Sequence, residues 1–242
     1  MPRAPCGARG FFVYTAAMND LEGALSILSR DKKFAALIKK YGRPDLKRPS
    51  TRRGASGTNS FQALVRSIIH QQVSGAAART IHERFLALFP KTKFPTPEMV
   101  RKMPLEKMRA AGLSGQKVSY IKDLAEKFSD GTIRHRELDR MESADIVEHL
   151  TQVKGIGVWT VHMFLIFTLN RPDVLPTGDL GIRKGFQALY KLKNLPDHAQ
   201  MEKLARKWHE HASVASWYLW RVADAEKVNA RPAMHSKYRK RK

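Results

Sequence analysis

Cysteine is almost absent from this chain of 242 residues, since Cys6 is its only one. One cysteine excludes a disulfide within the chain, a zinc site built from several cysteines and an iron–sulfur cluster held by four of them. Long apolar runs are lacking as well, because none approaches the ~20 residues that a helix needs to cross a bilayer. We therefore expect a soluble protein with no cysteine-ligated metal site and no membrane as a partner.

Acidic residues are scarce in relation to basic ones. The chain has 22 Asp and Glu against 44 Lys and Arg, so its formal net charge is +22, and its isoelectric point is about 10.4. Such an excess supplies much of the salt-sensitive, sequence-independent part of DNA affinity. RNA or an anionic lipid surface would satisfy the charge equally well. The charge therefore indicates a polyanionic partner without choosing one.

The alternation of apolar and polar residues that marks a half-buried strand is missing too, and apolar residues recur at helical spacing instead. A clear case is the three-four spacing of Phe61, Leu64, Val65, Ile68 and Ile69. The sequence thus predicts an all-α protein. Its length suffices for one large domain or two small ones with a substantial core.

The sequence pattern along the chain predicts five segments. These are a disordered extension at 1–18, helices at 19–59 that pack with the C-terminal part, a helical bundle at 60–174, a C-terminal helical segment at 175–229 and a basic tail at 230–242. The start of the chain carries arginine and no acid, but its apolar run is too short for a convincing signal peptide, so an extension is favoured over a targeting segment. The tail is typical of a solvated arm, with extra phosphate contacts as the alternative.

A pair of glycines interrupts the helical pattern within residues 150–160 (LTQVKGIGVWT) and predicts a helix, a hairpin and a second helix. Gly155 and Gly157 permit a tight turn and leave backbone N–H groups uncovered by a Cβ. A nucleic-acid phosphate can bind to these groups and to the N-terminus of the following helix. Such a hairpin would hold DNA without regard to its sequence.

Four motifs occur in a fixed order: residues 71–74 (QQVS), the hairpin, residues 176–179 (PTGD) and residues 215–220 (ASWYLW). In this combination they resemble the helix-hairpin-helix, Gly/Pro-Asp (HhH-GPD) superfamily of base-excision DNA glycosylases. Within it, the chain is similar to the branch that removes alkylated purines, the 3-methyladenine DNA glycosylase II type. The resemblance runs from about residue 61 to about residue 225. It implies a two-lobed helical fold with the active-site cleft between the lobes. The N-terminal β domain of some relatives is not expected here, because only about sixty residues precede the core and their pattern is helical.

Asp179 is the catalytic residue that the resemblance implies. Cleavage of an N-glycosidic bond passes through an oxocarbenium-like sugar, and a carboxylate beneath the anomeric carbon can stabilise that charge and orient or deprotonate water. An Asp at the start of a helix is also a common N-cap. The two roles are compatible with each other.

Trp159 stands two residues after the second hairpin glycine, where bifunctional relatives carry the lysine that forms a Schiff base. Strand cleavage by β-elimination is therefore not expected. The resemblance places Trp159 in the base pocket, where its π face can stack on a flipped, cationic purine; the alternative is a core tryptophan. Met163, one helical turn further on, is expected in the same wall.

Extruding a nucleotide leaves a hole in the base stack, and the family fills it from the turn that this chain writes as residues 70–74. Gln72 matches the wedge position and Gln71 is expected beside the flipped nucleotide, whereas the plainer alternative is an ordinary helix terminus. The resemblance also assigns the DNA phosphate to Lys154, Gly155, Gly157 and Thr160. Hairpin carbonyls are candidates for a monovalent cation, and no other cofactor is expected.

The sequence departs from the family pattern at residues 210–213 (EHAS), where relatives commonly carry a proline, an aromatic, an arginine and a serine. His211 takes the place of the aromatic. It either stacks on the lesion, as a base-pocket residue, or forms a solvated pair with Glu210. Trp217 and Trp220, further along, fit a core stripe.

Together these features predict a monofunctional DNA glycosylase of base-excision repair. It would hydrolyse the N-glycosidic bond of 3-methyladenine and 7-methylguanine in duplex DNA and leave an abasic site. We expect a monomer located at DNA inside the cell, in bacterial cytoplasm and nucleoid or in a nucleus. A non-catalytic helix-hairpin-helix DNA-binding protein and a glycosylase/lyase for other lesions are the alternatives.

Overall fold

The structure is a computed structural model that describes residues 20–46 and 57–229. The expected N-terminal extension, the expected basic tail and part of the loop before residue 57 lie outside the described residues. Those that are described form α-helices and one 3-10 helix and no strand, which confirms the all-α prediction. None of these helices combines the length and the apolar character that a membrane span requires.

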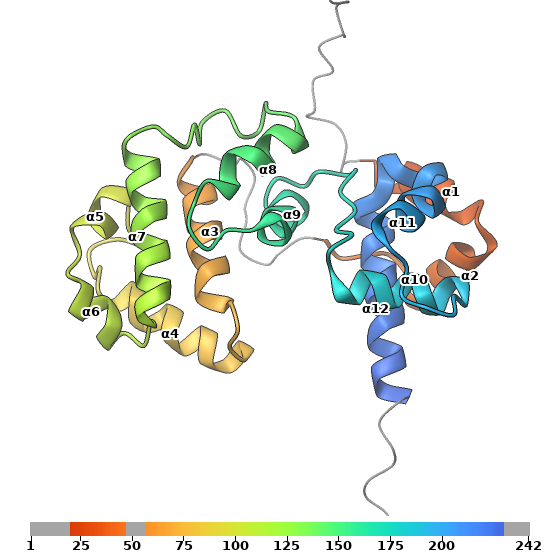
Figure 1. Ribbon diagram of the computed structural model, residues 1–242, viewed down its shortest axis with the longest axis horizontal. Coiled ribbons are helices and arrows are strands. Elements are labelled where there is room, and N and C mark those ends of the chain that lie inside the picture. The colour runs from red at the N-terminus through yellow and green to blue at the C-terminus, as the bar shows by residue number, and fades with distance from the viewer. Residues whose placement is uncertain (1–19, 47–56, 230–242) are drawn as a thin grey trace, which may run out of the picture.

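Helices α3 to α9 form one lobe, on the left and in the middle of Figure 1. Their bounds are Gly57–His70 for α3, Gly75–Ala87 for α4, Pro97–Lys102 for α5, Leu105–Ala110 for α6, Gly115–Ser129 for α7, Ser143–Thr151 for α8 and Val158–Phe167 for α9. Helix α7 packs against α3, α5 and α6. Its buried apolar residues follow helical spacing, and they therefore bring the three neighbours around a common core.

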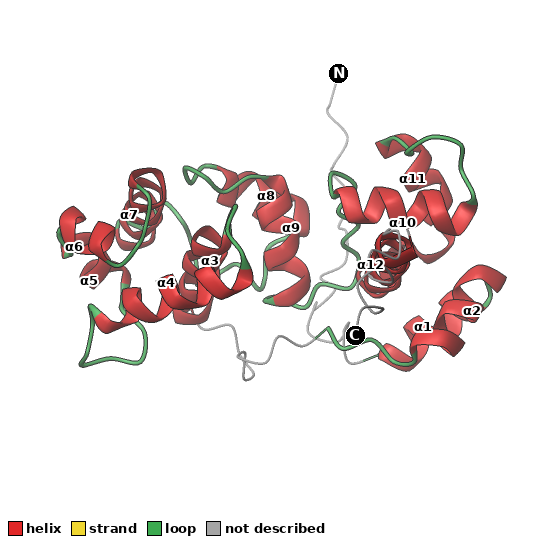
Figure 2. Cartoon of the chain, turned by 90° about the horizontal axis from the view of Figure 1, so that it is seen from below, coloured by secondary structure: helices red, strands yellow, loops and turns green. Residues whose placement is uncertain are grey.

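The second lobe joins the start of the described chain to its end, and Figures 1 and 2 both show it apart from α3 to α7. It consists of α1 (Leu21–Ser29), α2 (Lys32–Tyr41), α10 (Leu180–Tyr190), α11 (His198–Ala205), the 3-10 helix η1 (Arg206–His211) and α12 (Ala212–Asn229). The hydroxyl of Tyr218 on α12 donates to the carbonyl of Gly42, at 2.8 Å. That of Tyr190 on α10 donates to the Asp31 carboxylate at 3.2 Å. These bonds tie α1 and α2 to the C-terminal helices.

Helix α9 is apolar on all sides and lies in the middle of the molecule (Figure 1). Most of its residues are buried, as expected for a helix with no polar face. The large apolar side chains at its N-terminus differ, because Val158 is 51% exposed and Trp159 is 50% exposed. The hairpin therefore leads into a mostly buried helix whose large exposed apolar side chains are those of Val158 and Trp159.

The connection from α9 to α10 is fastened to both lobes by Arg171 and Ser213. The Arg171 side chain is buried, and its Nη2 donates to three carbonyls of the loop before α8, those of Leu138, Asp139 and Met141, at 3.3, 3.1 and 2.6 Å. The hydroxyl of Ser213, at the start of α12, donates to the Arg171 carbonyl at 2.6 Å and accepts from the Val174 N–H at 3.2 Å. The segment that leads to Asp179 is thereby fixed between the lobes.

Helices α10 and α12 cross at close range because α10 has a glycine at the contact. A Cβ added to Gly185 would lie 2.4 Å from the Leu219 carbonyl oxygen, which belongs to the backbone of α12. Only glycine permits this approach. The crossing brings the N-terminal end of α10, where Asp179 lies, beside Trp220 of α12.

Candidate active site

Asp179 is the N-cap of α10, as one of the two expected roles requires. Its Oδ1 accepts the N–H of Ile182 at 2.9 Å, the bond that an N-cap carboxylate makes to the third residue of a helix. The side chain remains partly exposed. Capping therefore holds the carboxylate at a fixed place without closing it off from solvent.

Two indole groups, one from each lobe, also donate to this carboxylate. Trp159 Nε1 on α9 lies 2.6 Å from Asp179 Oδ2, and Trp220 Nε1 on α12 lies 2.9 Å from Asp179 Oδ1. Trp220 packs on the core as the sequence predicts, with its ring stacked on Phe167 at 5.9 Å. Its bond to Asp179 is a contact that the sequence reading missed. The site thus lies at the junction of the two lobes.

The aromatic surface at this junction belongs to Trp159. An exposure of 50% does not fit the alternative reading of Trp159 as a core residue. Its N–H is engaged by Asp179, so the ring face is what it offers to a ligand. Met163, one turn further along α9, is 9% exposed and belongs to the core cluster, so it contributes little surface beside the ring.

The two hairpin glycines have different reasons to be glycine. Gly155 has a φ of +78°, and a Cβ there would lie 2.0 Å from Cδ2 of Tyr120 on α7. Gly157 is the N-cap of α9 with an ordinary φ of −96°, and a Cβ there would meet nothing within 4 Å. Neither the backbone nor the packing of the protein demands a glycine at 157. Open space on this side of the hairpin suits the close approach of a ligand.

The start of α9 offers backbone donors beside that open space. Gly157 provides no side-chain cap, so the first N–H groups of the helix have no partner within it. Thr160 is 5% exposed, so its side chain contributes little to this surface. Lys154, on the other side of the hairpin, is exposed. The first turn of α9 and Lys154 together form a site that suits an anion.

Residues of α7 contact the hairpin and hold its backbone in place. The carboxylate of Asp123 accepts the Lys154 N–H at 2.9 Å and the Lys127 ammonium at 2.6 Å. Burial opposes the charged form of Asp123, but these hydrogen bonds outweigh it and lower the pKa of the carboxyl. The ring of Tyr120 fills the space beside Gly155. Sequence reasoning named none of these supporting residues, because nothing in local spacing links α7 to the hairpin.

The turn after α3 is bonded to the hairpin through Gln71. The side-chain Nε2 of Gln71 donates to the Gly155 carbonyl at 2.8 Å, so Gln71 ties the two loops together in addition to its expected place beside a nucleotide. Lys117 Nζ donates to the Ile69 carbonyl at 2.7 Å and fixes the end of α3. Gln72 is exposed and has a φ of +55°, a strained conformation for a residue with a side chain. Strain at an exposed turn is consistent with a functional position.

Two hairpin carbonyls already have hydrogen-bond partners. The Val153 carbonyl accepts the Ile156 N–H at 3.1 Å, and the Gly155 carbonyl accepts from Gln71. A carbonyl oxygen has two lone pairs, so these bonds are compatible with the expected monovalent cation. No cluster of three or more His, Cys, Asp or Glu side chains suited to a metal occurs among the described residues.

His211 is the last residue of η1 and is half-buried, while Glu210 beside it is exposed. Within the described part of the chain, no hydrogen bond or ring contact joins His211 to Asp179 or Trp159. The structure brings Asp179 and Trp159 together, ties Gln71 to the hairpin, and leaves both readings of His211 as alternatives.

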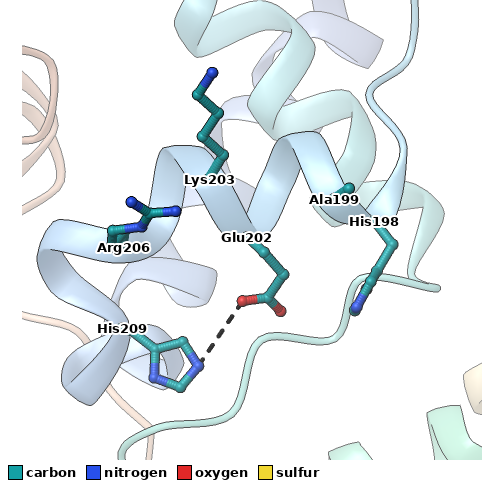
Figure 3. Close-up of a pocket in the computed structure, with 6 residues that line it drawn as sticks. All are labelled: His198, Ala199, Glu202, Lys203, Arg206 and His209. Atoms are coloured by element: carbon teal, nitrogen blue, oxygen red, sulfur yellow. Dashed lines mark ion pairs between the residues drawn. The ribbon is translucent and has the colours of Figure 1, made fainter.

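A separate cavity of about 610 Å³ lies on the second lobe, as Figure 3 shows, and Asp179 does not line it. Its lining residues are His198, Ala199, Glu202, Lys203, Arg206 and His209. Glu202 faces His209, with 3.9 Å between Oε2 and Nε2. His198 Nδ1 lies 2.8 Å from the hydroxyl of Thr177, two residues before Asp179. The cavity is thus a neighbour of the segment that carries Asp179 and not part of the indole–carboxylate site.

This geometry defines a class of helical proteins with two lobes. One lobe carries a glycine hairpin, and the other carries a carboxylate at the start of a helix. Residues 65–211 match the family model described as HhH-GPD superfamily base excision DNA repair protein. The chain belongs to this superfamily.

Several similar proteins are named as glycosylases or glycosidases of 3-methyladenine. The chain is 37% identical to DNA-3-methyladenine glycosylase 1 of Schizosaccharomyces pombe over 209 residues, which cover 85% of this chain and 89% of that protein. The structure of the S. pombe 3-methyladenine DNA glycosylase in complex with abasic DNA superposes with a TM-score of 0.67 at 36% identity, over 82% of this chain and 95% of that one. A DNA-3-methyladenine glycosidase from Bacillus halodurans gives a TM-score of 0.74 at 32% identity, over 87% and 93% of the two chains.

Proposed function

We propose that this protein is a monofunctional DNA glycosylase, which acts as a monomer on duplex DNA. It hydrolyses the N-glycosidic bond of alkylated purines, 3-methyladenine and 7-methylguanine among them, and leaves an abasic site. One observation carries the proposal: the exposed ring of Trp159 is hydrogen-bonded to the Asp179 carboxylate at 2.6 Å. The names of the relatives support 3-methyladenine as a substrate.

The chemistry needs a flipped purine, a water molecule and a negative charge near C1′ of the sugar. A purine alkylated at N3 or N7 is cationic, so it stacks well on the Trp159 ring. The bond from the base nitrogen to C1′ breaks with its electron pair going to the base, which leaves as a neutral molecule. Asp179 stabilises the oxocarbenium-like sugar and accepts the proton of the attacking water, whose oxygen then bonds to C1′.

Binding to the DNA backbone falls to the hairpin in this proposal. The N–H groups at the start of α9, the open space beside Gly157 and the exposed Lys154 suit one phosphate. The net charge of +22 adds attraction that does not depend on sequence. In this proposal Gln72 enters the duplex at the vacated position, and its place at an exposed turn that is bonded to the hairpin through Gln71 supports this role.

Two features argue against the alternatives. Trp159 has no amine with which to form a Schiff base, which disfavours a glycosylase/lyase. A protein that only binds DNA has no use for a partly exposed carboxylate held by two indoles.

The deciding experiment measures free base released from DNA methylated with dimethyl sulfate, which contains both 3-methyladenine and 7-methylguanine. We expect release of both bases without strand cleavage and without a covalent adduct on borohydride treatment. Binding of the DNA with no release of base would favour the non-catalytic alternative. An adduct that depends on one lysine would favour the glycosylase/lyase.

A further inference from the structure

The indole of Trp220 is held on two sides so that its N–H meets Asp179. Its ring stacks on Phe167 with an interplanar angle of 23°. On the side of α10, a Cβ added to Gly181 would lie 3.0 Å from Trp220 Cδ1 and 2.9 Å from Asp179 Oδ1. The lack of a side chain at 181 therefore leaves room for the contact between indole and carboxylate.

The three donors divide unequally between the two carboxylate oxygens. Oδ1 accepts from Ile182 N and from Trp220 Nε1, both at 2.9 Å. Among the described residues, Oδ2 accepts only from Trp159 Nε1, at 2.6 Å. A carboxylate oxygen has about two lone-pair sites, so Oδ1 is saturated by the protein and Oδ2 has one site left.

We propose that Trp220 is a positioning residue that saturates Oδ1 of Asp179 and so makes Oδ2 the oxygen that acts on the sugar and the water. This inference rests on the proposed function. Without the Trp220 N–H, Oδ1 gains an open lone pair and the carboxylate loses one of the bonds that fix its plane. The charge that faces the sugar is then less well oriented before the reaction, and orientation is the main contribution of such a group.

The first test observes the bond itself and needs no enzymatic activity. The chain has four tryptophans, so an ¹H–¹⁵N spectrum of the ¹⁵N-labelled protein contains four indole N–H signals that single Trp→Phe variants assign. Asp179→Ser keeps a side-chain N-cap for α10 but is too short to reach both indoles. We expect this variant to move the Trp159 and Trp220 signals and to leave the Trp217 signal in place. An unmoved Trp220 signal would overturn the inference.

The second test is kinetic and uses a matched pair of variants on one helix. Trp220→Phe keeps an aromatic ring on Phe167 and removes the N–H. Trp217→Phe is the control, because Trp217 is also partly buried against the core but stacks with Arg221 at 4.6 Å and makes no described bond to Asp179. Under single-turnover conditions on methylated duplex DNA, we expect Trp220→Phe to lower the rate constant for base release about tenfold, the effect of losing one hydrogen bond to a charged group.

The half-saturating enzyme concentration should stay within twofold of the wild-type value, and Trp217→Phe should change neither quantity. A rate constant within twofold of wild type for Trp220→Phe would overturn this inference and leave the proposed function untouched. So would a parallel loss of DNA binding, which is the result of a merely structural role. A wild-type protein that releases no alkylated base would overturn the proposed function and this inference with it.

Discussion

At Asp179, three N–H groups donate to one side chain, and all three require an acceptor. Asn in this place has a single acceptor oxygen, and its own N–H₂ group would face a donor. We expect Asp179→Asn to lower the rate constant for base release by ~10²-fold or more, because the charge that faces the sugar is lost. Binding to duplex DNA should stay within a few fold, since the hairpin is untouched. Turnover close to wild type in a folded variant would show that Asp179 is not the catalytic group.

Trp159 has two separable parts, a ring face for the base and an N–H for Asp179. Trp159→Phe keeps a face and removes the N–H, so it should slow the release of cationic 7-methylguanine and neutral hypoxanthine by similar factors. Trp159→Ala removes the face as well, and the additional loss should be larger for 7-methylguanine. Single-turnover excision from matched duplexes measures both variants. Equal additional losses on the two substrates would contradict selectivity by stacking.

At the scale of elements, the hairpin shows that two glycines of one motif can be required for different reasons. Gly155→Ala should lower the free energy of unfolding by about 2 kcal/mol, because φ is +78° there and the Cβ meets Tyr120. Gly157→Ala should cost about 1 kcal/mol or less, the usual effect of Ala at an N-cap. The same variant should weaken binding to abasic duplex DNA. Denaturant unfolding measures the stability effect and fluorescence anisotropy measures the DNA affinity. An unchanged DNA affinity in Gly157→Ala would show that the hairpin does not bind the phosphate.

The sequence predicted the elements well and their meeting points poorly. The hairpin and the position of Asp179 at a helix start are local features, fixed by glycine geometry and capping chemistry, and the structure contains both. Trp220 lies 41 residues from Asp179 along the chain. Its apolar spacing correctly indicated burial, but spacing does not show which distant group the polar edge of a ring will meet.

Met163 illustrates the same limit within a single helix. It lies one turn from Trp159 on α9, and helical spacing therefore put both in one wall of the base pocket. Helix α9 is apolar on every side, so its sequence has no polar face from which to judge exposure. The structure leaves Trp159 50% exposed and Met163 only 9% exposed. That difference is set by the neighbouring helices.

On the scale of the whole molecule, the charge of +22 predicts DNA binding that falls steeply with salt. If Lys154 binds one phosphate, Lys154→Gln should reduce the slope of log K against log salt concentration by about 0.9. Lys40→Gln is the control, because Lys40 lies on α2 of the second lobe and its ammonium is over the Tyr41 ring at 5.0 Å. Titrations at several salt concentrations give the slopes. Equal slopes for Lys154→Gln and Lys40→Gln would place the lysine contact elsewhere.

The buried Arg171 links the two lobes through the hydrogen bonds of its side chain and of its backbone carbonyl. Its guanidinium is bonded to carbonyls of the first lobe, and its own carbonyl accepts from Ser213 of the second. Melting of the first lobe alone would remove the carbonyl partners of the guanidinium, and melting of the second lobe alone would remove the Ser213 donor from the Arg171 carbonyl. We therefore expect one heat-absorption peak in calorimetry, with equal calorimetric and van 't Hoff enthalpies. In Arg171→Met the peak should broaden or split, whereas a split peak in the wild type would mean that each lobe melts by itself.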